Sequence, residues 1–490
     1  MRNNEIPAGV LPNRLELFYG GAWHAPTNGR FADTINPAYN TPICSVPLAD
    51  AEDVDAAVRA ADLAFPAWAE TPPMQRAKLL RKAADVIREN AMPLAQLDAL
   101  NNGNPVSALL RDADFAADLL EYFAGLATEN KGETIPMGPG NLNYTVQEPL
   151  GVVARIVAYN HPFMFAATKM AAPLIAGNTV VIKASDQAPL SILKLAELIG
   201  HIFPAGVVNF LCGDRTCGEA LSKHSLVRKV TLIGSVPAGM AVARSASDDL
   251  KPILLELGGK NALIAYPDAN KDALVDGIIS GMNFTWAGQS CGSTSRLFLH
   301  ESIHDEILAR VTELLPARHT PGIPTDPTTT MGALISDDHL QKVEGYVRTA
   351  LREGARLVCG GRRSQEPALK DGFFYEPTIL ADVEHHMQVA QEEIFGPVLS
   401  VLKWSDEDEL FHAVNGVNFG LTGSIWTTDL DKAHRAARRI QTGYVWINNV
   451  SQHFLGAPFG GIKHSGLGRE ESFAEIEAFT YTKNINIKFR

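Results

Sequence analysis

The chain has 490 residues, 46% hydrophobic and 20% charged, which is ordinary globular composition and excludes disordered and fibrous classes. At roughly 150 residues per domain, the length suggests about three domains and a core that needs no metal or disulfide staple. The 43 basic and 55 acidic residues give a formal net charge of −12, and without a long basic run this disfavours nucleic-acid binding.

Residues 51–130 are predicted to be mostly helical. Apolar residues recur at three- and four-residue spacing in AEDVDAAVRAADLAFPAWAE, and Asp50 or Asp53 is expected to cap the first helix. From 147 to 260, short β-branched runs such as GVVARIVAY and NTVVIKA alternate with helical stretches. Such alternation is typical of βαβ units on a parallel sheet. A second alternating segment spans about 261–470, so we expect an α/β protein with two tandem α/β domains.

Two segments fit neither pattern. Residues 127–146 are polar, glycine-rich and extended, and the C-terminal FTYTKNINIKF alternates like a strand. Together they are expected to form a projecting sheet with exposed edges. An edge of this kind needs a partner, which predicts a homodimer or homotetramer. Folding of the tail back onto its own domain is the alternative.

The five cysteines are few, odd in number and without a CxxC pair, which argues for a reducing compartment and against disulfides or zinc. The N-terminal MRNNEIPAGVLPNRLELF has no apolar stretch of signal-peptide length, and no apolar run reaches the roughly 18 residues of a membrane span. We therefore expect a cytoplasmic protein that binds no membrane and no metal.

A cysteine stands between small residues in GQSCGSTSR, residues 288–296. Ser290 and Gly292 give Cys291 little steric cover, so its thiol and its own N–H are candidates to face a reacting group. A buried free cysteine without chemistry is the alternative.

A carboxylate lies in the apolar run LLELGGKNA, residues 254–262. Burial of Glu256 in a strand would raise its pKa toward working pH, which suits a general base. A structural ion pair with Lys260 or an arginine is the alternative.

Two further features lie at the expected carboxyl edge of the parallel sheet. Gly234, Ser235 and Gly239 follow the strand KVTLI and open a helix, and such a turn favours pyrophosphate. Lys183 and Asp186 end the strand VVIKASD, where an acidic group commonly takes ribose hydroxyls. A plain turn and a helix cap are the respective alternatives.

Taken in order, the motifs resemble those of the aldehyde dehydrogenase superfamily from about residue 17 to the end. The set comprises Asn160 in VAYNHPF, Lys183 in VIKAS, Gly234 and Gly239, Glu256 in LELGGKN, Cys291 in GQSCGSTSR, Glu393 and Phe395 in QEEIFGPV, and PFGGIKHSGLGRE at 458–470. The resemblance implies a Rossmann-type cofactor domain (1–126 with 147–257), an α/β catalytic domain (258–473) and a β oligomerisation arm (127–146 with 474–490).

The resemblance also implies roles for single residues. Cys291 is the nucleophile, Asn160 and the Cys291 N–H hold the oxyanion, and Glu256 activates the water that hydrolyses a thioester. Lys183 and Asp186 bind the adenosine ribose, Ser235 the pyrophosphate and the Leu257 backbone the carboxamide. Glu393 binds the nicotinamide ribose, with Phe395 beside it. Lys169 is expected behind the centre, as a proton relay or, preferably, as an ion-pair partner.

The same resemblance leads to expectations for the cofactor and the substrate. Asp186, where relatives often have Glu, still repels a 2′-phosphate, so NAD is expected rather than NADP. The substrate pocket is expected to include His161, Phe165, Phe284, Ser290, Gly292, His453, Phe454 and Phe459. A rim of Phe and His without an evident arginine suits an aromatic or medium-sized neutral aldehyde.

Other functions stay open on the residues alone. A betaine-type aldehyde is disfavoured because Thr168 stands where many relatives have Trp, and a carboxylate-bearing semialdehyde because no arginine adjoins Cys291 closer than Arg296. A CoA-acylating enzyme would have less need of Glu256. A cofactor-independent cysteine esterase would have no use for a pyrophosphate-binding turn at 234–239. A non-catalytic scaffold would not need Cys291.

Overall fold

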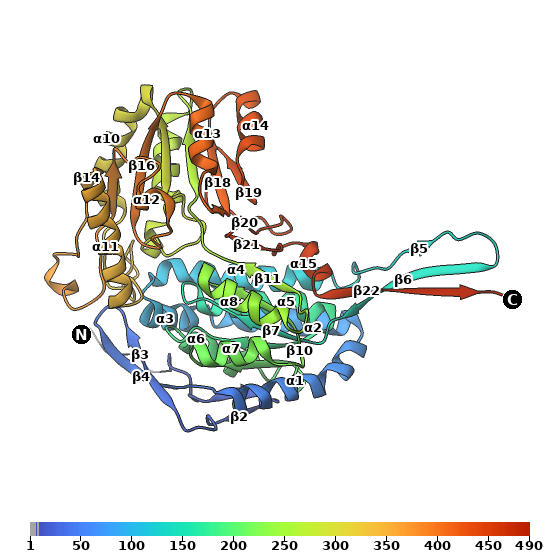
Figure 1. Cartoon of the computed structure of the whole chain (residues 1–490). Coiled ribbons are helices and arrows are strands. Elements are labelled where there is room, and N and C mark those ends of the chain that lie inside the picture. The colour runs from blue at the N-terminus through green and yellow to red at the C-terminus, as the bar shows by residue number, and fades with distance from the viewer. Residues whose placement is uncertain (1–5, 7–8) are drawn as a thin grey trace.

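The computed structural model describes residue 6 and residues 9–490, and it has an α/β architecture, as predicted. Figure 1 shows two α/β lobes, one built mainly from the first half of the chain and one from the yellow-to-orange second half, with a thin sheet projecting from the first lobe. Within the described residues, no helix combines the length and the apolar character needed to cross a membrane.

The first lobe is built on an eight-stranded sheet in the order β2-β1-β9-β8-β7-β10-β11-β21. Its five central strands are parallel, as the βαβ alternation predicts, and β1 and β21 pair with them in antiparallel fashion. The strands are β1 (Leu17–Tyr19), β2 (Ala22–His24), β7 (Val152–Ile156), β8 (Thr179–Lys183), β9 (Val208–Leu211), β10 (Val227–Ile233), β11 (Ile253–Glu256) and β21 (Gly466–Leu467). A short hairpin, β3 (Phe31–Asn36) and β4 (Thr41–Pro47), precedes the helices.

Helices cover both faces of this sheet. On one side, α5 (Pro162–Ala176) and α6 (Leu190–Ile199) pack against the strands and against the outer helices α2 (Pro73–Glu89), α3 (Ala91–Asn102) and α4 (Val106–Gly125). The other helices packed on the strands are α1 (Ala51–Glu70), α7 (Arg215–Lys223) and α8 (Val236–Ser247). Asp50 caps α1 in a reciprocal capping box with Asp53, so both predicted residues take part.

The second lobe holds a seven-stranded sheet in the order β14-β15-β16-β13-β12-β18-β19, parallel except for β14. Its strands are β12 (Ala262–Ala265), β13 (Arg296–His300), β14 (Arg356–Cys359), β15 (Thr378–Ala381), β16 (Val398–Trp404), β18 (Thr422–Trp426) and β19 (Tyr444–Ile447). Its helices are α9 (Lys271–Gly281), α10 (Glu301–Arg318), α11 (Asp337–Glu353), α12 (Gln388–Gln391), α13 (Glu407–Asn415) and α14 (Leu430–Arg439), with 3-10 turns η1 (Phe284–Trp286) and η2 (Pro367–Leu369). β17 (Phe419–Gly420) and β20 (Ile462–Lys463) form a small ladder.

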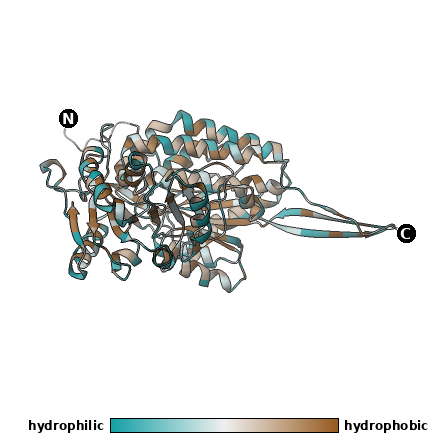
Figure 2. Cartoon of the chain, turned by 90° about the horizontal axis from the view of Figure 1, so that it is seen from above, coloured by the Kyte–Doolittle hydropathy of each residue, from teal (hydrophilic) through white to brown (hydrophobic). Residues whose placement is uncertain are grey.

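The projecting sheet joins segments far apart in the sequence. After α15 (Phe473–Glu477), β22 (Thr480–Lys488) runs antiparallel to β6 (Asn141–Pro149) over its whole length, and β5 (Thr134–Ile135) pairs with the other edge of β6. Figure 2 shows this ribbon, hereafter the arm, extending away from both lobes. An added strand would pair with the free edge of β22. It would also cover the exposed side chains of Tyr481, Ile487 and Phe489.

Candidate active site

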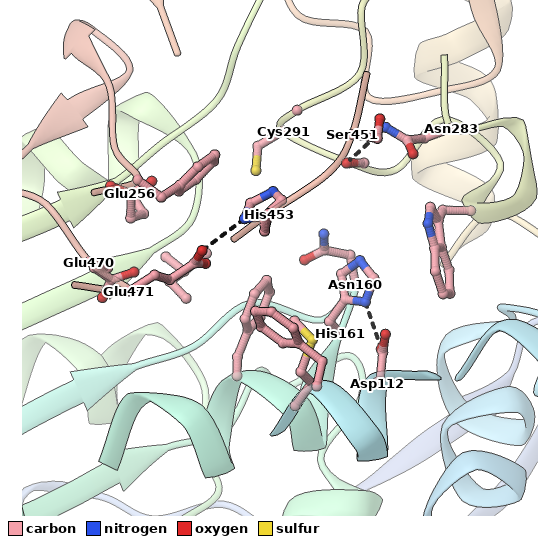
Figure 3. A pocket seen from close by; sticks show the side chains of 18 of the residues that line it. Asp112, Asn160, His161, Glu256, Asn283, Cys291, Ser451, His453, Glu470 and Glu471 are labelled. Atoms are coloured by element: carbon pink, nitrogen blue, oxygen red, sulfur yellow. Dashed lines mark hydrogen bonds and ion pairs between the residues drawn. The ribbon is translucent and has the colours of Figure 1, made fainter. Parts of the chain in front are cut away.

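Two cavities meet at the predicted nucleophile. One has a volume of about 360 Å³ and the other about 410 Å³, and Asn160, Ile233, Glu256 and Cys291 line both. β11 carries Glu256, the turn after β7 carries Asn160, and the loop between η1 and β13 carries Cys291. The structure therefore brings the three predicted catalytic side chains to one point, and Figure 3 shows the Cys291 sulfur pointing into the smaller cavity.

The Cys291 loop is held by a buried amide. Asn261 Nδ2 donates to the carbonyl oxygens of Cys291 (2.7 Å) and Ser293 (2.9 Å). Burial raises the pKa of the Cys291 thiol to about 12, with the negative charges of Glu256 and Glu393 adding to it and the backbone N–H groups of Cys291 and Gly292 opposing it. The thiol is therefore protonated at neutral pH, and a base or a nearby positive charge must promote the thiolate.

Asn160 is fixed through its backbone and its side chain. Its carbonyl oxygen accepts from the amides of Asn102 (3.2 Å) and Asn104 (2.8 Å), both near the end of α3. Asn160 Nδ2 donates to the Gln289 carbonyl at 3.1 Å. An amide nitrogen carries two hydrogens, so one remains for an oxygen bound beside Cys291.

Glu256 is buried, and neither of its carboxylate oxygens has a hydrogen-bond partner among the described residues. Burial raises its pKa well above the usual range, the charge of Glu470 adds to this, and Lys169 opposes it. The expected alternative, an ion pair with Lys260, is not formed, because Lys260 Nζ is also unpartnered within the described part of the chain. An unpaired carboxyl of raised pKa facing both cavities has the properties of a general base.

A buried charge network lies behind Glu256. Lys169 Nζ pairs with Glu470 Oε2 at 2.7 Å, and Arg155 pairs with Glu470 at 3.2 Å and with Glu475 at 2.8 Å. Lys169 thus takes the second of the two roles considered for it. Arg155 and Glu475 were missed from the sequence, where Arg155 is one charge in the apolar strand GVVARIVAY.

The larger of the two cavities runs along the carboxyl edge of the first sheet. Lys183 at the end of β8 and Asp186 just after it line this cavity, as do Gly234 and Ser235 before α8. Leu257, Glu393 and Phe395 also line it. It shares Lys183, Asp186 and Ala238 with a further space of about 910 Å³. Gly239 lies outside this lining, and a Cβ there would meet the Leu257 side chain at 2.6 Å, so its role is close packing.

These residues fit a dinucleotide. The N-terminus of α8 offers N–H groups for a pyrophosphate, and the carboxylates of Asp186 and Glu393 line the same cavity, where they can accept from ribose hydroxyls. Glu393 Oε1 accepts from the Gly259 N–H at 2.9 Å, and a Cβ at Gly258 would lie 2.5 Å from Glu393 Cδ, so glycine is needed there. Burial raises the pKa of Glu393 to about 7, and the Gly259 hydrogen bond opposes the rise.

The smaller cavity, hereafter the substrate cavity, contains most of the predicted pocket residues: His161, Phe165, Ser290, Gly292, His453 and Phe459. Two predicted residues do not line it. Phe284 is fully buried in the core of the second lobe beside His319, and Phe454 is half exposed outside the cavity. Both were chosen for aromatic character in the right loop, and the sequence does not show which way a loop side chain turns.

Several lining residues were not predicted: Arg111, Asp112, Phe115, Trp446, Glu470 and Glu471. Arg111 corrects the expectation of a rim without arginine, because α4 brings it to the cavity from far away in the sequence. Nothing local marks these residues, since Arg111, Asp112 and Phe115 resemble any polar and apolar positions of an amphipathic helix.

Comparison with known proteins gives one consistent family. The model of the Aldehyde dehydrogenase family matches residues 23–485. The chain is 53% identical over 485 residues to the aldehyde dehydrogenase tropH of Talaromyces stipitatus, covering 98% of this chain and 94% of that protein.

Solved structures agree with this. A putative aldehyde dehydrogenase from Burkholderia cenocepacia is 40% identical (TM-score 0.94, 96% of this chain and 97% of that one). PnpE in complex with nicotinamide adenine dinucleotide is 39% identical (TM-score 0.94, 96% and 97%). Betaine aldehyde dehydrogenase from Staphylococcus aureus in complex with NAD+ is 34% identical (TM-score 0.94, 97% and 94%).

Proposed function

Because the chain belongs to the aldehyde dehydrogenase family, we propose that it oxidises an aldehyde to the free carboxylic acid with NAD, through a covalent intermediate on Cys291. The observation that carries the proposal is the meeting of the two cavities at Cys291, Glu256 and Asn160. A thiol at this junction touches a small substrate on one side and a dinucleotide on the other.

In the first step, the Cys291 thiol loses its proton to solvent water and the thiolate sulfur attacks the aldehyde carbon. A C–S bond forms as the carbonyl π pair moves to oxygen. The oxyanion is held by the Asn160 amide and the Cys291 N–H, and one such donor is typically worth about 2.7–4 kcal/mol. NAD+ held by Asp186, Ser235 and Glu393 would supply a hydride acceptor for this carbon, and a thioester on Cys291 would remain.

In the second step, Glu256 takes a proton from a water that attacks the thioester carbon, and the thiolate of Cys291 leaves. The raised pKa of Glu256 makes it a stronger base than an exposed carboxylate when it is ionised. A Cβ at Gly460 would lie 2.8 Å from Glu256 Oε1, so this glycine leaves space beside the base.

NAD rather than NADP is proposed from Asp186, which lines both spaces at the carboxyl edge. A carboxylate opposite a 2′-phosphate is a like-charge contact, whereas it accepts hydrogen bonds from ribose hydroxyls. Relatives solved with NAD are consistent with this proposal.

Further parts of the proposal concern the whole molecule. We place the cofactor domain at 1–126 with 147–257, the catalytic domain at 258–473 and the oligomerisation arm at 127–146 with 474–490. The open edge of β22 supports assembly into a homodimer or homotetramer. The cysteine pattern supports a cytoplasmic location.

The test is a panel of aromatic, aliphatic and quaternary-ammonium aldehydes followed by NADH absorbance, with identification of the product. An aromatic or medium-sized aldehyde should give one acid per NADH. Transfer to CoA in place of acid formation, or turnover of esters but of no aldehyde, would contradict the proposal.

A further inference from the structure

The loop that carries Cys291 is fastened to the second lobe by a buried side chain, the amide of Asn261. Asn261 directly precedes β12, and its carbonyl oxygen accepts from the Arg296 N–H at 3.0 Å, so its backbone continues the ladder between β12 and β13. Its side chain is buried. The amide is therefore held by the sheet and not by the loop that it contacts.

The hydrogen bonds of this amide fix its orientation. Asn261 Oδ1 accepts from the Thr422 N–H at 3.0 Å, and a backbone N–H can only donate. Nδ2 therefore faces the loop, where it donates to the carbonyl oxygens of Cys291 at 2.7 Å and Ser293 at 2.9 Å. Both hydrogens of the amide are thus used to hold the loop.

The surroundings are shaped to this contact. A Cβ at Gly259 would lie 2.5 Å from the Cys291 carbonyl oxygen and 2.6 Å from Asn261 Oδ1, so glycine leaves the space that the amide needs. The Thr422 hydroxyl donates to the Gly292 carbonyl oxygen at the longer distance of 3.4 Å. Three consecutive carbonyl groups of the loop therefore each accept from Asn261 or Thr422.

An anchored Cys291 carbonyl also fixes the direction of the next N–H. The C=O of Cys291 and the N–H of Gly292 belong to one planar trans peptide and point in opposite directions. Within the described residues, no oxygen accepts from this N–H. Burial raises the pKa of the Cys291 thiol to about 12, the charges of Glu256 and Glu393 add to the rise, and the N–H groups of Cys291 and Gly292 oppose it. The Gly292 N–H is thus available to the thiolate.

Resting on the proposed function, in which Cys291 is the nucleophile, we infer that Asn261 is a positioning residue: by holding the Cys291 carbonyl, it aims the Gly292 N–H at the Cys291 sulfur and so stabilises the thiolate. The charge that forms when the thiol loses its proton then meets a donor that is already in place. Asn261 lines neither the substrate cavity nor the larger cavity beside it, so it acts only through this peptide group.

The experiment measures alkylation of Cys291 by iodoacetamide in the full-length protein without aldehyde, in mildly alkaline buffer at one fixed pH, with peptide mass analysis. Asn261→Leu keeps the branching of the side chain and removes its donors, and Asn261→Ala removes them without added bulk. A hydrogen bond to a charged group changes the thiolate fraction about tenfold or more. The greater nucleophilicity of a more basic thiolate offsets roughly half of this on a logarithmic scale. Alkylation of Cys291 should therefore slow at least about threefold in both variants.

Asn209→Leu is the matched control, because Asn209 is a fully buried amide with the same bonding pattern in the other lobe. Its Nδ2 donates to the carbonyl oxygens of Val180 at 3.0 Å and Gly206 at 2.8 Å, and its Oδ1 accepts from the Gly20 N–H at 2.9 Å. The same substitution there removes an equal number of hydrogen bonds far from the loop. The rate of Cys291 alkylation in this variant should equal that of wild type.

A merely structural role predicts a change of the opposite sign, because a loosened loop would expose Cys291 and speed its alkylation. Alkylation of Cys359 in the same digests reports on the fold of the second lobe and should keep its wild-type rate. Unchanged or faster alkylation of Cys291 in a folded Asn261 variant, or equal slowing in Asn209→Leu, would overturn the inference while leaving aldehyde oxidation intact. NADH formation by wild type from no aldehyde would instead overturn the proposed function. If Asn261→Leu does not fold, as judged by circular dichroism, Asn261→Ala decides.

Discussion

Replacement of Gly258 by alanine is expected to weaken NAD binding without destabilising the protein. The new Cβ would lie 2.5 Å from Glu393 Cδ, closer than the 3.0 Å that real Cβ atoms respect. Glu393 is the end of a flexible side chain, so it moves aside at little cost to folding. Its movement breaks the 2.9 Å hydrogen bond from the Gly259 N–H and removes the carboxylate from the proposed ribose position.

The size of the effect follows from that one interaction. A hydrogen bond to a charged group is worth about 1.5–3 kcal/mol, so KM for NAD should rise about tenfold to a hundredfold. The assay is steady-state NADH formation with NAD varied. The assay should be run above pH 7, where the ionised form of Glu393 dominates, because burial raises the pKa of Glu393 to about 7.

Two controls make the result specific. Gly345→Ala adds the same methyl group to α11, where nothing lies within 4 Å, and should leave KM unchanged. In a Glu393→Ala background, Gly258→Ala should add little, because the group that it displaces is gone. A KM for NAD within twofold of wild type in Gly258→Ala, or full additivity of the two changes, would refute the reasoning.

Three further predictions concern the base, the cofactor and the assembly. In Glu256→Gln, a single-turnover burst of NADH should survive while steady-state turnover falls by roughly 10²–10⁴-fold; equal loss in both phases would give Glu256 another role. In the wild type, the rate of thioester hydrolysis should rise with pH, because burial raises the pKa of Glu256 and a larger fraction of the base is ionised at higher pH. Asp186→Ser should raise kcat/KM with NADP relative to NAD, and wild-type parity between the cofactors would contradict the assignment of Asp186. Light scattering should give two or four times the 53.0 kDa chain mass, and deletion of 480–490 should lower that mass or cause aggregation; a full-length monomer at micromolar concentration is the opposing result.

Much of the site was predictable because its parts lie at the ends of strands. Glu256 ends β11, Lys183 ends β8 and Ser235 follows β10, so a parallel sheet brings them to one edge. The alternation of β-branched runs and helices was enough to predict that sheet. Cys291 and Asn160 were identified from the ordered family motifs, because the pattern of strands and helices does not show that these two residues lie together.

The parts that were missed depend on long-range packing. Asp112 lies on α4 and meets His161 only because α4 packs on α5, and an aspartate on an amphipathic helix gives no sign of this. Glu471 follows a glycine-rich loop that could place it in many ways. Phe284 shows the opposite error, a residue wrongly expected in the pocket. It lies near the catalytic loop in the sequence, but its side chain is buried in the core of the second lobe.

The measurement that tests the central claim most directly is intact-mass analysis of Glu256→Gln, acid-quenched after incubation with aldehyde and NAD. The account predicts one acyl adduct per chain, mapped by peptide digestion to Cys291 and absent in Cys291→Ser, Glu256→Gln. An adduct on Cys44, Cys212, Cys217 or Cys359, or NADH formation in the burst with no adduct on any cysteine, would contradict a thioester on Cys291.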